Sequence, residues 1–415
     1  MGEKRNIVIC CDGTGNVYGE ENSNVVKLYA TLEINAGQIG YYHPGVGTMG
    51  APSANNKVEE EWSIIKGLAF GAGLMPNVGD AYRYLMNNYR GEDDNIFIFG
   101  FSRGAYTARA LAGMLQTYGL LCPGNEGLIP YVTRMYKRAS HELQRQGAHT
   151  FDVAHGFRKT YGREVKLHFV GVWDTVSSVG WIYDPVKLLY TARNPIMRIG
   201  RHAVSIDERR CFFRDNLWGE PMKPGDRYYD FDQPQDIKQV FFAGVHCDVG
   251  GSYPEFVPVK SESGEVHLRP DSGLSKLALE WMLREASLAG LKIKEDYARV
   301  VLGRMPLPPD ERLPYCKPDP AGTMHKSLSG PWWIAEFVPH QYWDKDTKQI
   351  KHRIPMGAPR QIPLNDDRII MHESVQQRLN DRPDYQPPNL PSRNLKEHFK
   401  IEPRIEFPAA NAATP

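Results

Sequence analysis

The chain has 415 residues, of which 41% are hydrophobic and 24% charged. This composition is that of a globular protein with a sizeable core. The length predicts one large α/β domain, or a core with a small second domain. The 50 basic and 49 acidic residues leave a formal net charge of +1, which argues against nucleic acid as a partner. Six cysteines without a C-x-x-C pair indicate reduced, structural thiols.

Short apolar runs that resemble buried strands alternate with helical patterns along the first two thirds of the chain. The predicted strands are 7–11, 96–99, 167–172 and 240–243, and the predicted helices are 62–89, with a glycine-rich interruption at 67–79, and 105–118. Strands that alternate with helices indicate a mostly parallel sheet with helices on both faces. The sequence therefore predicts an α/β fold of the α/β-hydrolase type.

Longer segments separate these elements and suggest how the chain is divided. We expect residues 1–290 to form the hydrolase core, with lid-like insertions near 123–161 and 181–235 that cover the carboxyl ends of the strands. Residues 291–386 are expected to form a C-terminal insertion or cap region with a final helix. The tail, 387–415, is rich in proline, and an extended strap or disorder is expected there.

The N-terminal apolar run, 7–11, is much shorter than the core of a signal peptide. No stretch of the sequence reaches the roughly 20 apolar residues of a membrane span. These features predict a cytoplasmic protein without a transmembrane segment, whose export would need a signal-independent route.

The strongest local motif is GFSRG at 100–104, which lies directly after a predicted strand and directly before a predicted helix. In this context a G-x-S-x-G sequence predicts a nucleophile elbow, a strained turn that exposes the serine hydroxyl at the edge of the sheet. Ser102 is therefore the candidate nucleophile. The backbone N–H of Arg103, at the start of the helix, is a candidate donor to an oxyanion.

A serine nucleophile needs a base and an acid, and in α/β-hydrolases these follow it along the chain in the order acid, then histidine. Asp174 and His246 each follow a predicted strand, so they are the first candidates for the acid and the base. Asp248 is the alternative acid, with helix capping or cation binding as its other roles. His372, near the start of the final predicted helix, is the alternative base.

The first strand ends in CDGTGN at 11–16, a turn whose backbone N–H groups at Gly13 or Thr14 are candidates to complete an oxyanion hole. Asp12 is expected to brace this loop or to bind a cation. Asp12 and Asp248 are thus weak candidates for a metal site, although no metal or other cofactor is expected. The glycine spacing fits neither G-x-G-x-x-G nor a P-loop.

Six motifs in order carry a resemblance to a known family: CDGTGN at 11–16, PGVGT at 44–48, GFSRGAYTAR at 100–109, VGVWDTVSSVG at 170–180, HAVSIDERR at 202–210 and FAGVHCDVGGSYPE at 242–255. Together they resemble the uncharacterised α/β-hydrolase family that includes the type VI secretion phospholipase effectors. The resemblance covers residues 6–290, with HESVQQR at 372–378 as a final motif. It implies a triad of Ser102, Asp174 and His246 and an acyl ester of a phospholipid as substrate.

The sequence thus predicts a serine esterase or lipase that acts on a small-molecule or lipid ester through an acyl-enzyme. Two alternatives stay open: a catalytically inactive binding or assembly module on a hydrolase fold, and a phosphohydrolase that depends on Asp12. Trp332, Trp333 and Trp343 are candidates to line an acyl site, or simply to form the core of the C-terminal region. The sequence leaves the oligomeric state open.

Overall fold

The structure is a computed structural model that describes residues 4–13, 18–45, 73–145, 149–176, 188–261, 263–330, 332–344, 349–364 and 366–408. Its centre is an eight-stranded sheet with the strand order β14-β13-β8-β7-β6-β3-β1-β2, in which all neighbouring strands pair in parallel. The predicted mostly parallel sheet is confirmed. The strands of this sheet are β1 (Arg5–Cys11), β2 (Gln38–His43), β3 (Asp94–Phe101), β6 (Leu167–Trp173), β7 (Met197–Ser205), β8 (Asp236–Phe242), β13 (Ile369–His372) and β14 (Lys400–Glu402).

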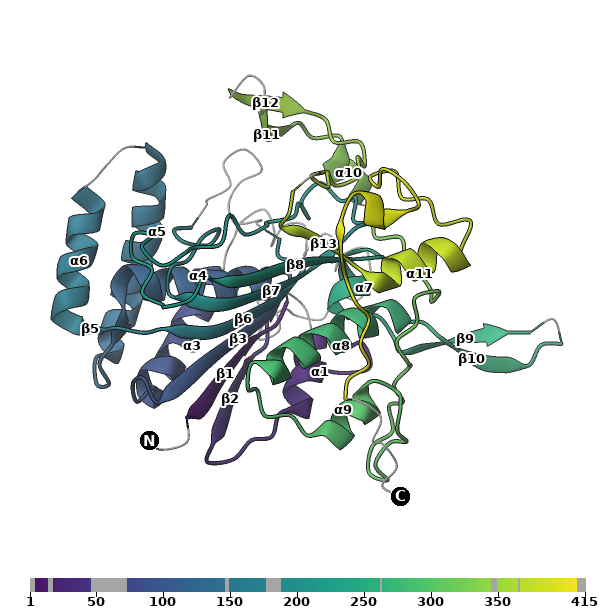
Figure 1. Ribbon diagram of the computed structural model, residues 1–415, viewed down its shortest axis with the longest axis horizontal. Coiled ribbons are helices and arrows are strands. Elements are labelled where there is room, and N and C mark those ends of the chain that lie inside the picture. The colour runs from purple at the N-terminus through teal and green to yellow at the C-terminus, as the bar shows by residue number, and fades with distance from the viewer. Residues whose placement is uncertain are drawn as a thin grey trace.

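Helices cover both faces of the sheet, as Figure 1 shows. On one side of the sheet lie α3 (Leu74–Asn88) and α4 (Arg103–Tyr118), with α5 (Ile129–Arg145) and α6 (His149–Tyr161) packed on these two helices. On the other side lie α1 (Asn24–Thr31), α8 (Gly273–Leu288) and α9 (Glu295–Val301). Three helices are short: α7 (His246–Gly250) follows β8, and α11 (Glu373–Asp381) follows β13. The third, α10 (Trp332–Glu336), precedes β11. The small elements are the ribbons β4 (Leu120–Leu121) with β5 (Gly162–Arg163), β9 (Phe256–Lys260) with β10 (Val266–Pro270) and β11 (His340–Asp344) with β12 (Gln349–Arg353), and the 3-10 turns η1 (Glu126–Leu128) and η2 (Leu395–Glu397).

Strands at the centre of the sheet are apolar throughout because helices cover both of their faces. Successive side chains of a strand point to opposite faces, so Ile7 and Ile9 of β1 join the cluster under α3 and α4, whereas Val8 and Cys10 join the cluster under α8. This pattern explains why the buried strands read as continuous apolar runs rather than as alternating ones.

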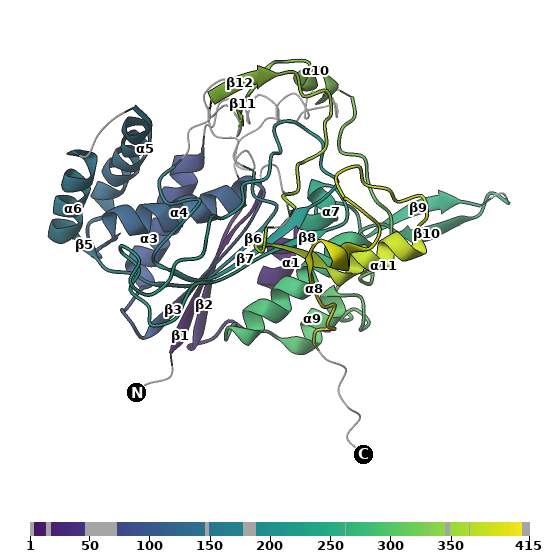
Figure 2. The same ribbon diagram turned by 45° about the horizontal axis from the view of Figure 1, so that its top comes forward.

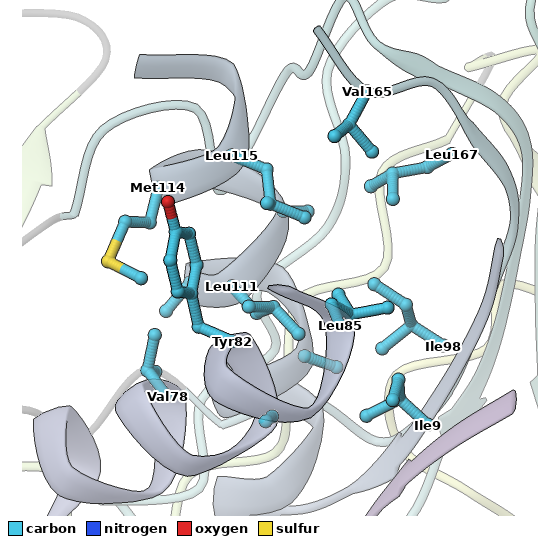
Figure 3. Close-up of a cluster of buried hydrophobic side chains, with 14 of the residues drawn as sticks. Ile9, Val78, Tyr82, Leu85, Ile98, Leu111, Met114, Leu115, Val165 and Leu167 are labelled. Atoms are coloured by element: carbon cyan, nitrogen blue, oxygen red, sulfur yellow. The ribbon is translucent and has the colours of Figure 1, made fainter. Parts of the chain in front are cut away.

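Figure 3 shows the first of these clusters, in which Tyr82 and Leu85 of α3 and Leu111 of α4 lie together beside Ile9 and Ile98. The hydroxyl of Tyr82 donates a hydrogen bond to the carbonyl of Gly119, 2.8 Å away. The only polar atom of that side chain is therefore satisfied, and its ring adds apolar area to the core.

Four strands of the sheet were not apparent from the sequence. β2 and β14 are edge strands, β13 has only four residues, and β7 (MRIGRHAVS) carries charged and glycine residues along its first half, so none contains a long apolar run. The segment 181–235, expected to be an insertion, thus contributes the central strand β7. The sheet also takes in β13 and β14, beyond the expected core of 1–290, and β14 lies in the proline-rich tail.

Two further predictions concern helical segments. The helix predicted over 62–89 is described only from Leu74, where α3 begins, and its earlier part lies outside the described residues. The segment 123–161 forms α5 and α6, which pack on α3 and α4. Among the described helices, none combines the length and apolar character needed to cross a membrane.

The junction of β3 and α4 is packed so closely that only glycine fits at two positions. A Cβ at Gly100 would lie 2.5 Å from the carbonyl oxygen of Gly104, and one at Gly104 would lie 2.2 Å from that of Cys11. The start of α4 is thereby pressed against the ends of β1 and β3, which fixes the turn at Ser102 between them.

We expect Gly104→Ala to lower the free energy of unfolding by about 1–3 kcal/mol or more, because the added methyl group collides with rigid backbone. Gly156→Ala is the matched control, since a Cβ at that helical position meets nothing within 4 Å and alanine favours the helix. Urea denaturation of both variants measures the effect. Equal stabilities would show that the junction is not tightly packed.

Candidate active site

Ser102 lies between β3 and α4, in a backbone conformation that is rare for a residue with a side chain. Its φ is 58° and its ψ is −122°, a strained region that is typical of functional turns. The backbone N–H of Ser102 donates to the carbonyl of Trp173 at 3.1 Å, which ties the turn to the end of the neighbouring strand β6. These features are those expected of a nucleophile elbow.

Asp174 and His246 are brought together at the same edge of the sheet. Asp174 directly follows β6, and His246 begins α7 shortly after β8. Nδ1 of His246 lies 2.5 Å from Oδ2 of Asp174, and both side chains are almost completely buried. The structure therefore pairs the predicted base with the predicted acid across 72 residues of sequence.

Arg360 holds the carboxylate of Asp174 from the other side. Its Nη1 donates to Oδ1 at 2.6 Å and its Nη2 to Oδ2 at 3.0 Å, and the backbone N–H of Ser205 donates to Oδ1 at 2.9 Å. The guanidinium also donates to the carbonyl of Phe213. Both carboxylate oxygens of this buried side chain are thus satisfied by several donors.

These contacts decide the charge of the pair. Burial alone would raise the pKa of Asp174, but Arg360 and His246 hold it well below the usual range. Burial lowers the pKa of His246 below its ordinary value, against the opposing effect of Asp174. Because Asp174 is ionised, Nδ1 of a neutral His246 carries the proton and donates it to Asp174, which leaves a lone pair on Nε2.

The imidazole of His246 is enclosed by two aromatic rings, with Phe101 and Phe213 at centroid distances of 4.6 and 4.7 Å. Its Nε2 is buried and, in the described part of the chain, has no hydrogen-bond partner. Ser102, which is half-buried, directly follows Phe101. The nitrogen that a serine base would use is therefore not bonded to another group, and no hydrogen bond joins it to Ser102.

A second buried carboxylate fixes the backbone of the histidine. Oε2 of Glu208 accepts a hydrogen bond from the N–H of His246 at 3.1 Å, and Oε1 accepts one from the hydroxyl of Ser327 at 2.9 Å. The guanidinium of Arg210 lies 3.0 Å from Glu208 and 3.6 Å from the ring centroid of Phe213. Burial would raise the pKa of Glu208, but Arg210 lowers it, so this residue is a charged anchor for the loop.

The two alternative residues have other partners. Nδ1 of His372 lies 2.7 Å from Oγ of Ser374 at the start of α11, and its ring stacks on Phe242. Burial lowers its pKa to about 3, so it is a neutral cap of that helix. Asp248 accepts from the N–H of Val245 at 3.0 Å and lies 2.6 Å from Nδ1 of His325, which makes it a brace for the loop before His246.

The first-strand turn is only partly described. Thr14 lies outside the described residues, and the N–H of Gly13 donates to Oδ1 of Asp12 at 2.6 Å. Oδ2 of Asp12 accepts from the hydroxyls of Ser23 and Tyr42, at 2.8 and 2.7 Å. Asp12 thus holds the loop in place through these hydrogen bonds, which is one of the two roles expected for it.

No group of three or more potential metal-ligating side chains occurs within the described ranges. Arg103 is the first residue of α4, and its side chain is largely buried, with Nε and Nη2 unpartnered in the described region. Burial lowers the pKa of its guanidinium to about 10. The geometry of its backbone N–H toward an oxyanion stays a prediction.

Sequence reasoning missed the two charged residues that hold the Asp174–His246 pair in place. Glu208 lies in the run DERR at 207–210, whose charge density just after a strand was a usable signal. Arg360 is a lone arginine in a segment without regular pattern, and nothing in the sequence marks it. Its role depends on a contact across 186 residues.

A comparison with known protein families shows which family the chain belongs to. The sequence model of a family described as "T6SS, Phospholipase effector Tle1-like, catalytic domain" matches residues 5–285, which is more than half of the chain. The chain belongs to this family. The range matched by the Tle1-like model contains Ser102, Asp174 and His246.

Two individual proteins are similar to this Tle1-like chain. The uncharacterized protein YEL023C of Saccharomyces cerevisiae is 36% identical over 221 residues, which are 51% of this chain and 32% of the yeast protein. The match thus spans about a third of the length of this curated relative. A crystal structure of an uncharacterized protein from Pseudomonas aeruginosa aligns with a TM-score of 0.39 and 20% identity, over 71% of this chain and 47% of the other.

We expect Arg360→Met to lower the free energy of unfolding by about 3–5 kcal/mol near pH 7, because it leaves a buried carboxylate without its cation. The pKa of Asp174 is depressed in the folded state, so the stability gained from this pair is complete above the unfolded pKa of about 3.9 and is lost as the pH falls further. The loss caused by the substitution should therefore shrink below about pH 4.

Urea titrations of wild type and variant at a series of pH values measure this difference. Arg368→Met is the control, since Arg368 forms a partly exposed pair with Asp366, and such pairs contribute about 1 kcal/mol or less. A loss for Arg360→Met as small as that of the control would contradict the electrostatic description of the site.

Proposed function

We propose that the protein is a serine hydrolase that cleaves an acyl ester bond of a phospholipid, with Ser102 as nucleophile, His246 as base and Asp174 as the residue that orients the histidine. Family membership supports lipids as the substrate class. The observation that carries the proposal is the buried Asp174–His246 pair, at 2.5 Å, on the sheet edge that also presents the strained turn at Ser102.

In the first half of the reaction, the hydroxyl oxygen of Ser102 attacks the ester carbonyl while Nε2 of His246 takes the hydroxyl proton. The tetrahedral intermediate places negative charge on the former carbonyl oxygen, near the start of α4. The N–H of Arg103 and the positive end of the helix dipole stabilise that charge. The ester C–O bond then breaks, and the imidazolium gives its proton to the departing alcohol, the lysophospholipid.

In the second half, water attacks the acyl-enzyme. Nε2 of His246 takes a proton from the water, and the bond between the acyl carbon and Ser102 breaks as the serine oxygen regains a proton. A fatty acid leaves, and the enzyme returns to its starting state. The unpartnered state of Nε2 supports this assignment, since a nitrogen held by another group could not accept these protons.

The ionised Asp174 has two effects on this cycle. It fixes the imidazole so that Nε2 rather than Nδ1 faces the reacting groups, and it stabilises the imidazolium formed at each transfer. Arg360 shares the charge of the same carboxylate, so the stabilisation of the imidazolium is weaker than an unshared carboxylate would give. Burial is the main reason why the pKa of His246 lies below its ordinary value, and Arg210 lowers it further.

We expect Ser102→Ala to lower the rate of phospholipid hydrolysis by about 10³-fold or more, because loss of the serine hydroxyl removes nucleophilic catalysis while substrate binding remains. Wild-type protein should also react covalently with a fluorophosphonate probe, and the variant should not. Release of fatty acid from phospholipid vesicles and probe labelling measure the two effects. An active, labelled Ser102→Ala protein would exclude this nucleophile, and an unlabelled, inactive wild type would favour a binding module on this fold.

The pH dependence provides a separate test of His246. Because His246 must be neutral to accept a proton, kcat/KM should fall as the pH drops through its pKa, which burial holds below about 6.5. The groups that face it are Asp174, Arg210 and Glu208, and none of them should titrate near neutral pH. We therefore expect an acid limb with a midpoint below 6.5 and a plateau above it, measured with an ester substrate from pH 4.5 to 8.5.

A His372→Gln variant separates the two candidate bases. We expect its acid limb to match that of the wild type, since His372 contacts Ser374 and Phe242 and not Asp174. A limb that disappears or moves in this variant would reassign the base.

A further inference from the structure

Helix α10, in the region after residue 290, has two apolar sides, and only one of them faces the protein. Trp332 is buried and packs edge-on against Phe213 at 5.4 Å, and Phe213 in turn contacts the ring of His246. Trp333, Ile334 and Phe337 point the other way and are 42–58% exposed. This helix is thus an apolar layer between the candidate base and the surface.

The exposed side of α10 continues into the chain that follows β12. The N–H of Met356 donates to the carbonyl of Glu336 at 3.3 Å, and Gly357 packs beside the ring of Trp333. Ile354 and Met356 are 50% and 61% exposed. We call the five exposed side chains the α10 surface; they are Trp333, Ile334, Phe337, Ile354 and Met356. Exposed apolar groups gathered in this way mark interaction sites more often than scattered ones do.

Charged residues beside the α10 surface are predominantly basic. A cavity of about 930 Å³ opens next to Trp333, and its lining includes five cationic and three carboxylate side chains. The cations are Arg209, Arg269, Lys326, Arg378 and Arg382, and the carboxylates are Asp207, Asp319 and Asp384.

Arg269 and Arg382 form ion pairs with Asp271 and Asp384, whereas Arg209 and Arg378 donate to backbone carbonyls. Arg209 donates to the carbonyl of Gly357 at 2.6 Å, and Arg378 donates to those of Pro320 and Gly322 at 2.7 and 2.8 Å. Nε of Arg378 is buried without a partner in the described region. Within 324–337 and 352–358 the sequence contains one carboxylate, Glu336, which is fully buried. The surroundings of the α10 surface therefore favour a negatively charged partner.

We propose that the α10 surface docks on a lipid bilayer that contains anionic phospholipids, with the adjoining basic cavity facing the headgroup phosphates. Apolar side chains that enter the acyl boundary, next to cations that meet anionic headgroups, are the features of a protein surface that binds at a membrane interface. This inference rests on the proposed function, because a phospholipid hydrolase must meet its substrate at such an interface.

The position of the surface adds to the argument. α10 and the β11–β12 ribbon lie at one end of the molecule in both views (Figures 1 and 2), away from the β9–β10 ribbon. The contacts from Trp332 through Phe213 to His246 link the α10 surface to the candidate base. α10 also lies outside the matched range 5–285, so it is not part of what the family match covers.

Binding is tested with Ser102→Ala protein, so that hydrolysis cannot alter the vesicles. Sedimentation with vesicles of phosphatidylcholine alone, or of phosphatidylcholine mixed with about 30 mol% phosphatidylglycerol, measures the partition coefficient. We expect stronger binding to the anionic vesicles and weaker binding in high salt. Ile334→Asp with Phe337→Asp should lower the partition coefficient at least tenfold, and Lys326→Glu should lower it for anionic vesicles only.

The control replaces two exposed apolar residues elsewhere. Val266→Asp with Leu268→Asp alters the β10 ribbon, where these side chains are 55% and 61% exposed, and should leave vesicle binding unchanged. Equal losses in both double variants would show a general apolar effect and overturn the proposal. Unaltered binding of the Ile334→Asp, Phe337→Asp protein would overturn it as well.

Two further outcomes separate this proposal from others. If the wild-type protein sediments as a dimer that the Ile334→Asp, Phe337→Asp substitutions dissociate, and vesicles do not bind, the α10 surface is an interface between two copies and the proposal is wrong. If vesicle binding depends on the α10 surface but the wild type cleaves no ester, docking is supported and the proposed hydrolase function fails instead.

Discussion

A charged carboxylate buried in the interior is the constraint on which the site depends. Asp174 is almost completely buried, and an isolated carboxylate there would be strongly destabilising. Arg360 supplies the opposite charge, and Ser205 and His246 supply further hydrogen bonds. Because every oxygen of Asp174 has a fixed donor, the imidazole beside it has one orientation and one favoured tautomer.

The parallel sheet explains why these groups meet. The carboxyl ends of β3, β6 and β8 lie at one edge, and in such sheets this edge is where binding and catalytic residues gather. Ser102 follows β3, Asp174 follows β6, and His246 lies just after β8. The glycines at 100 and 104 let α4 approach the sheet, and this close approach forces the strained turn that presents Ser102.

The chain after residue 290 completes the site rather than standing apart from it. Arg360 binds Asp174, and Trp332 packs on Phe213, which encloses His246. Further contacts come from Ser327 to Glu208 and from His325 to Asp248. The family match ends at residue 285, so these supports lie outside the matched range.

The sequence was sufficient to predict features that local patterns encode. Continuous apolar runs predicted β1, β3, β6 and β8, and the G-x-S-x-G motif between a strand and a helix predicted the turn at Ser102. Strand β7 could not be predicted, since its first half contains Arg198, Gly200 and Arg201 and its burial depends on neighbours on both sides. The role of Arg360 could not be predicted either, because its salt bridge with Asp174 spans 186 residues and no local sequence pattern indicates it.

The most direct test of the account is to look for the acyl-enzyme itself. Wild-type protein mixed with a phospholipid of defined acyl chains, quenched in acid within the first turnover and digested, is analysed by tandem mass spectrometry. The account predicts a peptide in which Ser102 carries the mass of one of those acyl chains. An acyl group on another residue, or fatty acid release without any acylated serine at this position, would contradict it.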